Sequence, residues 1–133
     1  PLVIIWLKSK SATLREVSRV SLIPGIFCIN EPVMFGTPIV LNPIMFLPFV
    51  FGTSLLGTMY GYILTKIGWV SAAYIQIPWT TPPLVQPFLS SGGDWRNVVA
   101  QAVLIVIMAF IWYPFAKLWE KRMLEVEKAD ETD

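Results

Sequence analysis

The sequence predicts an all-α membrane protein that combines transmembrane helices with two re-entrant hairpins. Hydrophobic residues make up 55% of the chain and charged residues only 14%, with a mean hydropathy of +0.62, whereas soluble domains are roughly a quarter charged. Between residues 21 and 94 only Glu31, Lys66 and Asp94 carry a charge. Long apolar stretches of this kind are typical of membrane-spanning segments. Prolines and glycines interrupt two of them, which indicates broken helices.

Residues 1–19 are predicted to be the end of a truncated transmembrane helix followed by a basic cytoplasmic connector. Residues 1–7 are apolar, and we expect them to end a helix that begins upstream, so that the chain is a C-terminal fragment. Residues 8–19 are polar and basic, with Leu14 and Val17 three positions apart. This pattern favours an amphipathic surface helix on the cytoplasmic face.

Residues 20–119 are expected to form part of a substrate-binding transmembrane domain. It would consist of a hairpin at 20–37, a helix at 38–65, a hairpin at 67–90 and a helix at 98–116. The run at 20–37 is too short and too interrupted to cross a hydrocarbon core of about 30 Å as one helix. Three prolines lie within residues 78–83, where they fix the backbone and remove hydrogen-bond donors. Both segments are therefore interpreted as hairpins that return to the side they entered.

The charged residues at both ends predict the orientation in the membrane. Residues 120–133 form a charged tail, expected to be cytoplasmic and, from residue 125, disordered. Basic residues cluster in 8–19 and again at Lys117, Lys121 and Arg122. Because loops kept in the cytoplasm carry an excess of Lys and Arg, both ends are expected on the cytoplasmic side of the membrane. Broken elements on opposite sides of a membrane build the midplane substrate sites of transporters.

Composition excludes most local enzyme chemistry. The chain has no His and a single cysteine, Cys28, so we expect no metal site, no cofactor and no catalytic nucleophile. A net charge of +1 gives no indication of a nucleic-acid partner. Two polar residues are expected to have structural roles. Asp94 is placed to cap the following helix. Asn42, beside Pro43, is placed to hydrogen-bond the backbone groups that the proline leaves without a partner.

Glu31 is the most informative residue. It is an acid inside an apolar segment punctuated by prolines and glycines. An ionisable side chain costs free energy in a bilayer, so one at this depth usually faces a polar cavity or a substrate path. Glu31 is therefore the first candidate for a functional site.

Three sequence motifs carry a resemblance to a known family. They are PGIFCINEPVMFGTPIVLNP at residues 24–43, PWTTPP at 78–83 and GGDWR at 92–96. In this order and spacing they closely resemble the C-terminal part of IIC permeases of the bacterial phosphotransferase system (PTS), in the lactose, cellobiose and diacetylchitobiose group. The resemblance covers about residues 5 to 120. One departure is Cys28, which stands where the family usually has Asn.

This resemblance implies a homodimeric permease of the bacterial inner membrane. It would move a β-linked disaccharide, of the cellobiose, chitobiose or lactose type, by an elevator-like motion. The sugar would be phosphorylated on its carbon-six hydroxyl by a phosphocysteine of a IIB component, which a IIA component serves. The chain would thus be the membrane component of a phosphotransferase. It would lack the N-terminal dimerisation helices and an upstream sugar-binding histidine of the family.

The resemblance also assigns substrate-binding roles. Glu31 would accept hydrogen bonds from sugar hydroxyls, or else cap a half-helix. The Asn30 side chain would offer the sugar hydroxyls both a donor and an acceptor. Alternatively, it would hold the hairpin tip in shape. Trp79 would stack on a pyranose face or anchor at the bilayer interface. Thr80 and Thr81 would donate to sugar oxygens or to backbone carbonyls freed by the following prolines.

Two other functions remain open from the sequence. In an ion-coupled secondary sugar transporter, Glu31 would carry the coupling ion and the product would be free sugar. A non-transporting membrane scaffold subunit is the third possibility, and the intact motifs around Glu31 and Trp79 argue against it.

Overall fold

The computed structural model describes residues 2–37, 39 and 41–130. Its helices are α1 (Leu2–Trp6), α2 (Ala12–Ile26), α3 (Glu31–Gly36), α4 (Pro43–Leu47), the π-helix η1 (Pro48–Leu56), α5 (Gly57–Ile67), α6 (Gln86–Ser90) and α7 (Trp95–Asp130). No strand occurs within these described ranges. The predicted all-α class is therefore confirmed.

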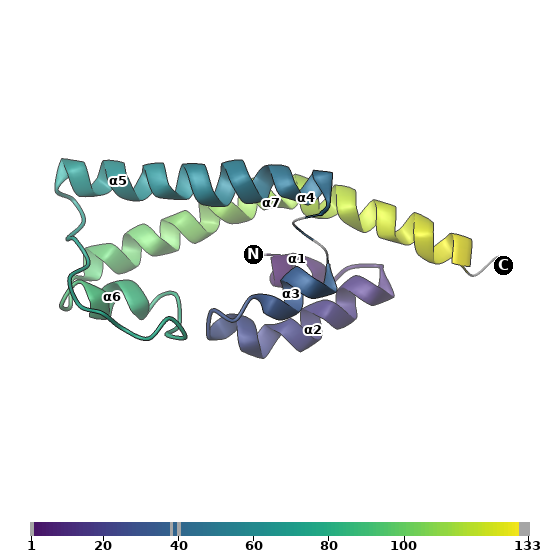
Figure 1. The fold of residues 1–133 in the computed structure, drawn as a ribbon, viewed down its shortest axis with the longest axis horizontal. Coiled ribbons are helices and arrows are strands. Elements are labelled where there is room, and N and C mark those ends of the chain that lie inside the picture. Colours follow the sequence, from purple (N-terminus) through teal and green to yellow (C-terminus); the bar gives the residue numbers. More distant parts are fainter. Residues whose placement is uncertain (1, 38, 40, 131–133) are drawn as a thin grey trace.

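Two long apolar helical elements form the frame of the molecule (Figure 1). The first joins α4, η1 and α5 into 25 continuous residues, Pro43–Ile67, and the second is the 36-residue α7; both are long and apolar enough to cross a membrane. The Trp112 indole donates to the Thr53 hydroxyl at 3.2 Å, and the Tyr60 hydroxyl donates to the Ala100 carbonyl at 3.0 Å. Because later residues of one helix meet earlier residues of the other, the two run antiparallel.

The first long element begins at Pro43, five residues after the predicted start at 38. Asn42 is its N-cap, since its side-chain oxygen accepts the Ile44 N–H at 3.0 Å. Proline suits the first helical position because its missing N–H would have no partner there. The structural role predicted for Asn42 is thus confirmed.

The π-helix η1 begins at Pro48 and packs closely on α7. A methyl group built on Gly52 would lie 3.1 Å from Cγ2 of Ile111, so a larger residue would push the helices apart. Proline cannot donate to the preceding turn. Local π geometry is one way in which a membrane helix satisfies the carbonyls that proline leaves free.

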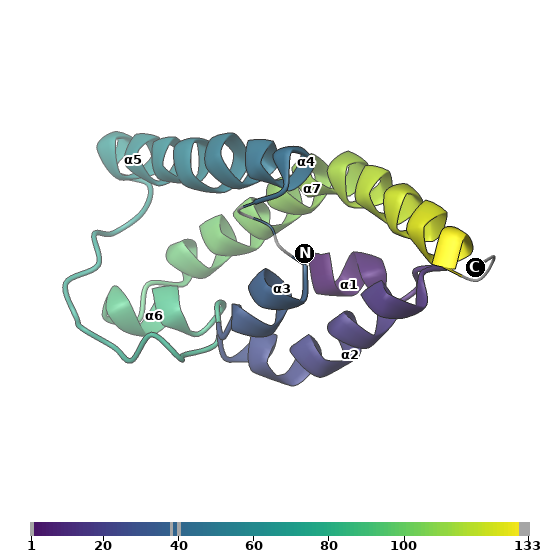
Figure 2. The ribbon, with the colours of Figure 1, turned by 45° about the vertical axis from the view of Figure 1, so that its right-hand side comes forward.

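Helices α1, α2 and α3 pack together beside the C-terminal half of α7 (Figure 2). Trp6 is fully buried and its indole donates to the Ala116 carbonyl at 3.2 Å. Gly36 lets α3 lie against α2, since a methyl group there would come within 2.9 Å of Cγ1 of Val17. Helix α2 runs without a break across the boundary drawn between residues 19 and 20. A re-entrant course for α2 and α3 stays a prediction.

The second predicted hairpin, at 67–90, is mostly irregular. Residues 68–85 contain no helix, and the rest of the predicted hairpin is the short helix α6. The segment still returns on itself, because the backbone N–H groups of Tyr74 and Ile75 both donate to the Ser90 carbonyl, at 3.0 and 3.1 Å. The Asn97 side chain pairs with both backbone groups of Ser71, at 3.1 and 2.9 Å. These bonds fasten the loop to the start of α7.

The C-terminal segment is helical where disorder was expected. Helix α7 continues to Asp130, so the expectation of a disordered segment is wrong for residues 125–130, while residues 131–133 lie outside the described part. Glu127 gives a reason: its Oε1 accepts the Ser11 hydroxyl at 2.7 Å and the Thr13 N–H at 3.1 Å, at the start of α2. This end of α7 therefore satisfies donors that the first turn of α2 leaves free.

Asp94 caps α7 as the sequence predicts. Its Oδ1 accepts the Arg96 N–H at 3.0 Å and its Oδ2 accepts the Ser71 hydroxyl at 2.6 Å. These two hydrogen bonds hold the pKa of Asp94 below its ordinary value.

Replacing Asp94 by Ala is expected to lower the melting temperature of the detergent-solubilised protein, because the first turn of α7 loses its cap. Asp94→Asn keeps a side-chain acceptor and should stay closer to the wild type. Since the folded pKa is depressed, the contribution is present at neutral pH and is lost as pH falls through that lowered pKa. Equal melting temperatures for the Ala and Asn variants would contradict the capping role.

Candidate functional site

The first part of the candidate site is the turn between α2 and α3. Helix α2 ends where the N–H groups of Phe27 and Ile29 donate to the Pro24 carbonyl, at 2.9 and 3.0 Å. Cys28 then takes a left-handed backbone conformation with φ of 60°. A residue other than glycine is uncommon there, and Asn is among the best tolerated. The turn lets α3 begin at Glu31.

The second part is the proline-rich loop at residues 78–83. The Thr81 hydroxyl donates to the Pro78 carbonyl at 2.7 Å, and the Thr81 N–H donates to the same oxygen at 3.1 Å. The Pro82 carbonyl accepts the N–H groups of Val85 and Gln86 at 3.0 and 2.9 Å. The Pro78 and Pro82 carbonyls are thus satisfied by the loop itself and by the residues that directly follow it.

The two parts meet through Cys28. Its thiol donates to the Thr81 carbonyl at 3.3 Å, across 53 residues of sequence. Both ribbon views show the turn between α2 and α3 facing the loop that precedes α6 (Figures 1 and 2). We define the α2–α3 turn with the start of α3 (residues 27–31) as the first tip and residues 78–83 as the second tip. The sequence alone does not predict that Cys28 joins the two tips.

The first tip presents unsatisfied polar groups. Asn30 is the N-cap residue of α3, is exposed, and makes no capping bond with its side chain. Glu31 is exposed, and its carboxylate has no hydrogen bond or ion pair among the described residues. Its carboxylate therefore does not cap a described helix, and both side chains are available to a ligand.

The second tip presents an aromatic face. Trp79 is 65% exposed, and its indole N–H has no partner within the described part of the chain. Thr80 is half-buried. The Thr81 hydroxyl donates its hydrogen bond to the Pro78 carbonyl. This contact favours the predicted bond to a backbone carbonyl, and the hydroxyl oxygen can then only accept a hydrogen bond from a ligand.

The side chains of Asn30, Glu31 and Trp79 lie on an exposed surface. Two cavities of the described structure lie elsewhere: one of about 140 Å³ between α5, α6 and α7, and one of about 210 Å³ beside Lys8 and Lys117. No tip residue lines either of them. The arrangement is an open polar and aromatic surface, with an acid and an amide on one side and an indole on the other.

Cys28 gives a testable prediction for the join between the tips. Cys28→Asn should keep the melting temperature of the wild type, because Asn tolerates the left-handed conformation and can donate to the Thr81 carbonyl. Cys28→Val should lower the melting temperature, since a β-branched residue is strongly disfavoured at positive φ, at a cost of about 1–2 kcal/mol or more. Equal melting temperatures of the two variants in detergent would show that the contact between the tips adds no stability.

Comparisons with known proteins agree with this architecture. The family described as "Phosphotransferase system, EIIC" matches residues 2–53. The lichenan permease IIC component of Bacillus subtilis is 37% identical over 126 residues, which are 94% of this chain and 28% of that protein. The cellobiose-specific EIIC component of Lactococcus lactis subsp. lactis is 38% identical over 129 residues, which are 97% of this chain and 24% of that protein.

A solved structure has the same fold. The crystal structure of the transporter ChbC, the IIC component from the N,N'-diacetylchitobiose-specific phosphotransferase system, matches with a TM-score of 0.90 and 37% identity. The match covers 96% of this chain and 30% of that one. The chain thus spans less than a third of the length of these relatives.

These observations define an integral membrane protein of the class that serves sugar phosphotransferase systems. The chain belongs to the EIIC family, in the group whose members are named for cellobiose, lichenan, lactose and diacetylchitobiose. The resemblance drawn from the three sequence motifs is confirmed.

Proposed function

We propose that this chain is the substrate-binding part of the permease component of a phosphoenolpyruvate-dependent sugar phosphotransferase system. It would bind a β-linked disaccharide and translocate it across the cytoplasmic membrane, coupled to phosphorylation by a IIB phosphocysteine. The observation that carries this proposal is the 3.3 Å contact between Cys28 and Thr81. It holds the candidate residues of two distant motifs on one surface.

The chemistry of the tips suits a sugar. Glu31 has a carboxylate with free acceptor sites, and charged acceptors bind hydroxyls about twice as strongly as neutral ones. Asn30 adds a donor and an acceptor. The exposed indole of Trp79 offers a flat apolar face for a pyranose ring and an N–H at its edge. A site built from paired hydroxyl contacts would reject sugars that lack those hydroxyls.

The chain's part in phosphoryl transfer would be positioning. The sugar hydroxyl oxygen forms the new bond to phosphorus as the sulfur–phosphorus bond of IIB breaks and the thiolate leaves. Such transfers depend on alignment and electrostatics rather than on a nucleophile from the binding protein. Glu31, by accepting a hydrogen bond from that hydroxyl, would orient it and would take up its proton as the oxygen–phosphorus bond forms.

Partners and orientation belong to the same proposal. Several relatives, such as that of Staphylococcus haemolyticus, are named lactose-specific EIICB components, which supports a IIB partner here. A IIA partner is proposed with it from the family resemblance. We propose a homodimer formed through parts of the protein outside this chain. Following the basic residues at both ends, we also propose a cytoplasmic C-terminus and re-entrant hairpins at the two tips.

Uptake of radiolabelled cellobiose tests the proposal. Cells carrying the complete gene would be assayed with and without the IIB partner, and the product scored as phosphorylated or free. Sugar phosphate that accumulates only with IIB would support the proposal. Free sugar that accumulates without IIB, and disappears with an ionophore, would overturn it in favour of an ion-coupled transporter.

A further inference from the structure

A basic cavity lies at the other end of α2 from the sugar-binding tips. Its volume is about 210 Å³, and it is lined by Lys8, Lys10, Lys117, Glu120, Lys121 and Leu124. The connector before α2 and the C-terminal half of α7 supply these residues. The 15 residues of α2 span about 22 Å at 1.5 Å per residue. The cavity is therefore separate from the proposed sugar site.

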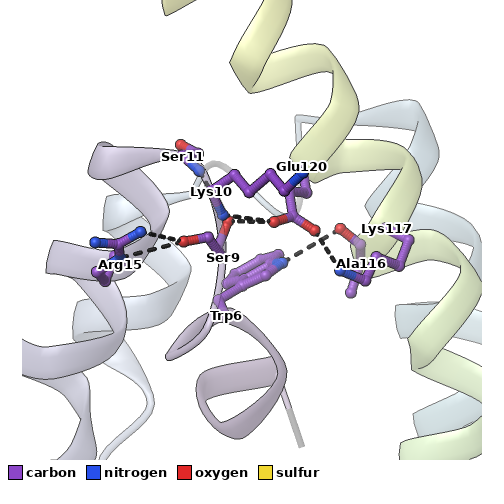
Figure 3. A network of polar contacts seen from close by, with 8 residues as sticks. All are labelled: Trp6, Ser9, Lys10, Ser11, Arg15, Ala116, Lys117 and Glu120. Atoms are coloured by element: carbon purple, nitrogen blue, oxygen red, sulfur yellow. Dashed lines mark hydrogen bonds and ion pairs between the residues drawn. The ribbon is translucent and has the colours of Figure 1, made fainter.

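The wall of this cavity is held by one buried carboxylate (Figure 3). Glu120 is only 6% exposed. Its Oε1 accepts the Ser9 hydroxyl at 2.6 Å and the Lys10 N–H at 2.9 Å, while its Oε2 accepts the Lys117 ammonium at 2.7 Å. The nearby Arg15 is occupied as well, because its guanidinium donates to the Ser9 carbonyl. The connector is thus fixed against α7, and the Glu120 charge is paired.

Three lysines of the cavity remain without a counter-charge. No ion pair joins Lys8, Lys10 or Lys121 to a carboxylate of the described residues. All three side chains are exposed at the cavity rim. Water alone would leave three ammonium groups repelling one another, whereas an anion would relieve that repulsion. A cavity of this size has room for several groups the size of a water molecule, about 30 Å³ each.

Two of the cavity's lysines directly follow apolar segments, as residues at a membrane interface do. Lys117 follows directly on the apolar run of α7, and Lys8 follows the apolar residues of α1. Long lysine side chains keep their stems along apolar surface and extend the ammonium group to the interface. Basic pockets between membrane helices bind the headgroups of anionic phospholipids.

We propose that this cavity binds a phosphate group, and that in the membrane it is the phosphate of an anionic phospholipid such as phosphatidylglycerol. Lys8, Lys10 and Lys121 would contact the phosphate oxygens, while Glu120 and Lys117 hold the wall in place. The bound lipid would brace the connector between α1 and α2 against α7. This inference depends on membrane embedding and is independent of which sugar the tips bind.

Native mass spectrometry and thermal unfolding of the complete purified protein test this site. Wild-type protein should retain phosphatidylglycerol in preference to phosphatidylcholine, and phosphatidylglycerol should raise its melting temperature. The triple variant Lys8→Gln, Lys10→Gln, Lys121→Gln should bind phosphatidylglycerol at least tenfold more weakly, given about fivefold per lysine near an anionic surface. Arg122→Gln is the matched control, because Arg122 neighbours Lys121 yet does not line the cavity.

A second arm identifies the source of the phosphate. If inorganic phosphate in detergent stabilises the wild type and the Arg122→Gln variant but not the triple variant, while phosphatidylglycerol has no effect, the phosphate site stands and the lipid assignment fails. Equal lipid binding by the triple variant and the wild type overturns the proposal. So does an equal preference of wild-type protein for phosphatidylcholine, a measurement that needs no variant.

Discussion

Replacing Glu31 by Gln is expected to weaken disaccharide binding by about 10- to 100-fold. The variant keeps the size of the side chain and loses the charge, and a hydrogen bond to a charged group is worth roughly 1.5–3 kcal/mol. The free carboxylate at the start of α3 provides no folding contact that this change would disturb. Equilibrium dialysis of radiolabelled cellobiose against the complete purified protein measures the effect.

Glu16→Gln is the matched control for that experiment. Glu16 is an exposed acid on α2 without a hydrogen-bond partner among the described residues, so its loss should leave the dissociation constant unchanged. If Glu31→Gln binds cellobiose as the wild type does yet no longer supports phosphorylation, Glu31 acts in the transfer step rather than in binding. If neither property changes, the site assignment is wrong.

Among the substitutions considered, Glu120→Ala is expected to lower the free energy of unfolding the most. The change leaves the Ser9 hydroxyl, the Lys10 N–H and the Lys117 ammonium without their common acceptor. Groups deprived of a partner in a buried setting cost about 1–3 kcal/mol, and breaking a buried ion pair about 3–5. Because Lys117 is half exposed, we expect a loss near the lower end of these ranges, about 2–3 kcal/mol in the free energy of unfolding.

Thermal unfolding of the complete protein in detergent checks this prediction. Glu120→Gln should be milder, since its amide oxygen can still accept from Ser9 and Lys10 while only the ion pair is lost. Glu125→Ala removes an exposed acid of the same helix and should leave the melting temperature within a degree or so. A Glu120→Ala variant as stable as Glu125→Ala would show that the connector is held by other contacts.

The sequence predicts local features of this fold well. The excess of apolar residues predicts the all-helical class, and the two apolar helices correspond to the runs at 38–65 and 98–116. Asp94 and Asn42 precede helices and cap them as their chemistry suggests. In each case the reason lies within a few residues of the position, where propensity and capping rules apply.

Long-range contacts could not be predicted in the same way. The helical end of α7 is held by bonds from Glu127 to the first turn of α2, and no local pattern indicates which distant donors a charged tail will meet. Cys28 carried one usable signal, since the family resemblance leads one to expect Asn at this position, which the structure places at positive φ. Its bond to Thr81 depends on how the two tips pack. The substrate roles remain predictions for all five candidates, Asn30, Glu31, Trp79, Thr80 and Thr81.

The proposed function requires the two tips to form one sugar site. A structure of the complete protein with bound cellobiose would decide this. We expect the sugar between residues 27–31 and 78–83, with a Glu31 carboxylate oxygen within about 3 Å of a sugar hydroxyl and a pyranose ring over Trp79. A disaccharide bound elsewhere, with Glu31 and Trp79 free of contact, would contradict it.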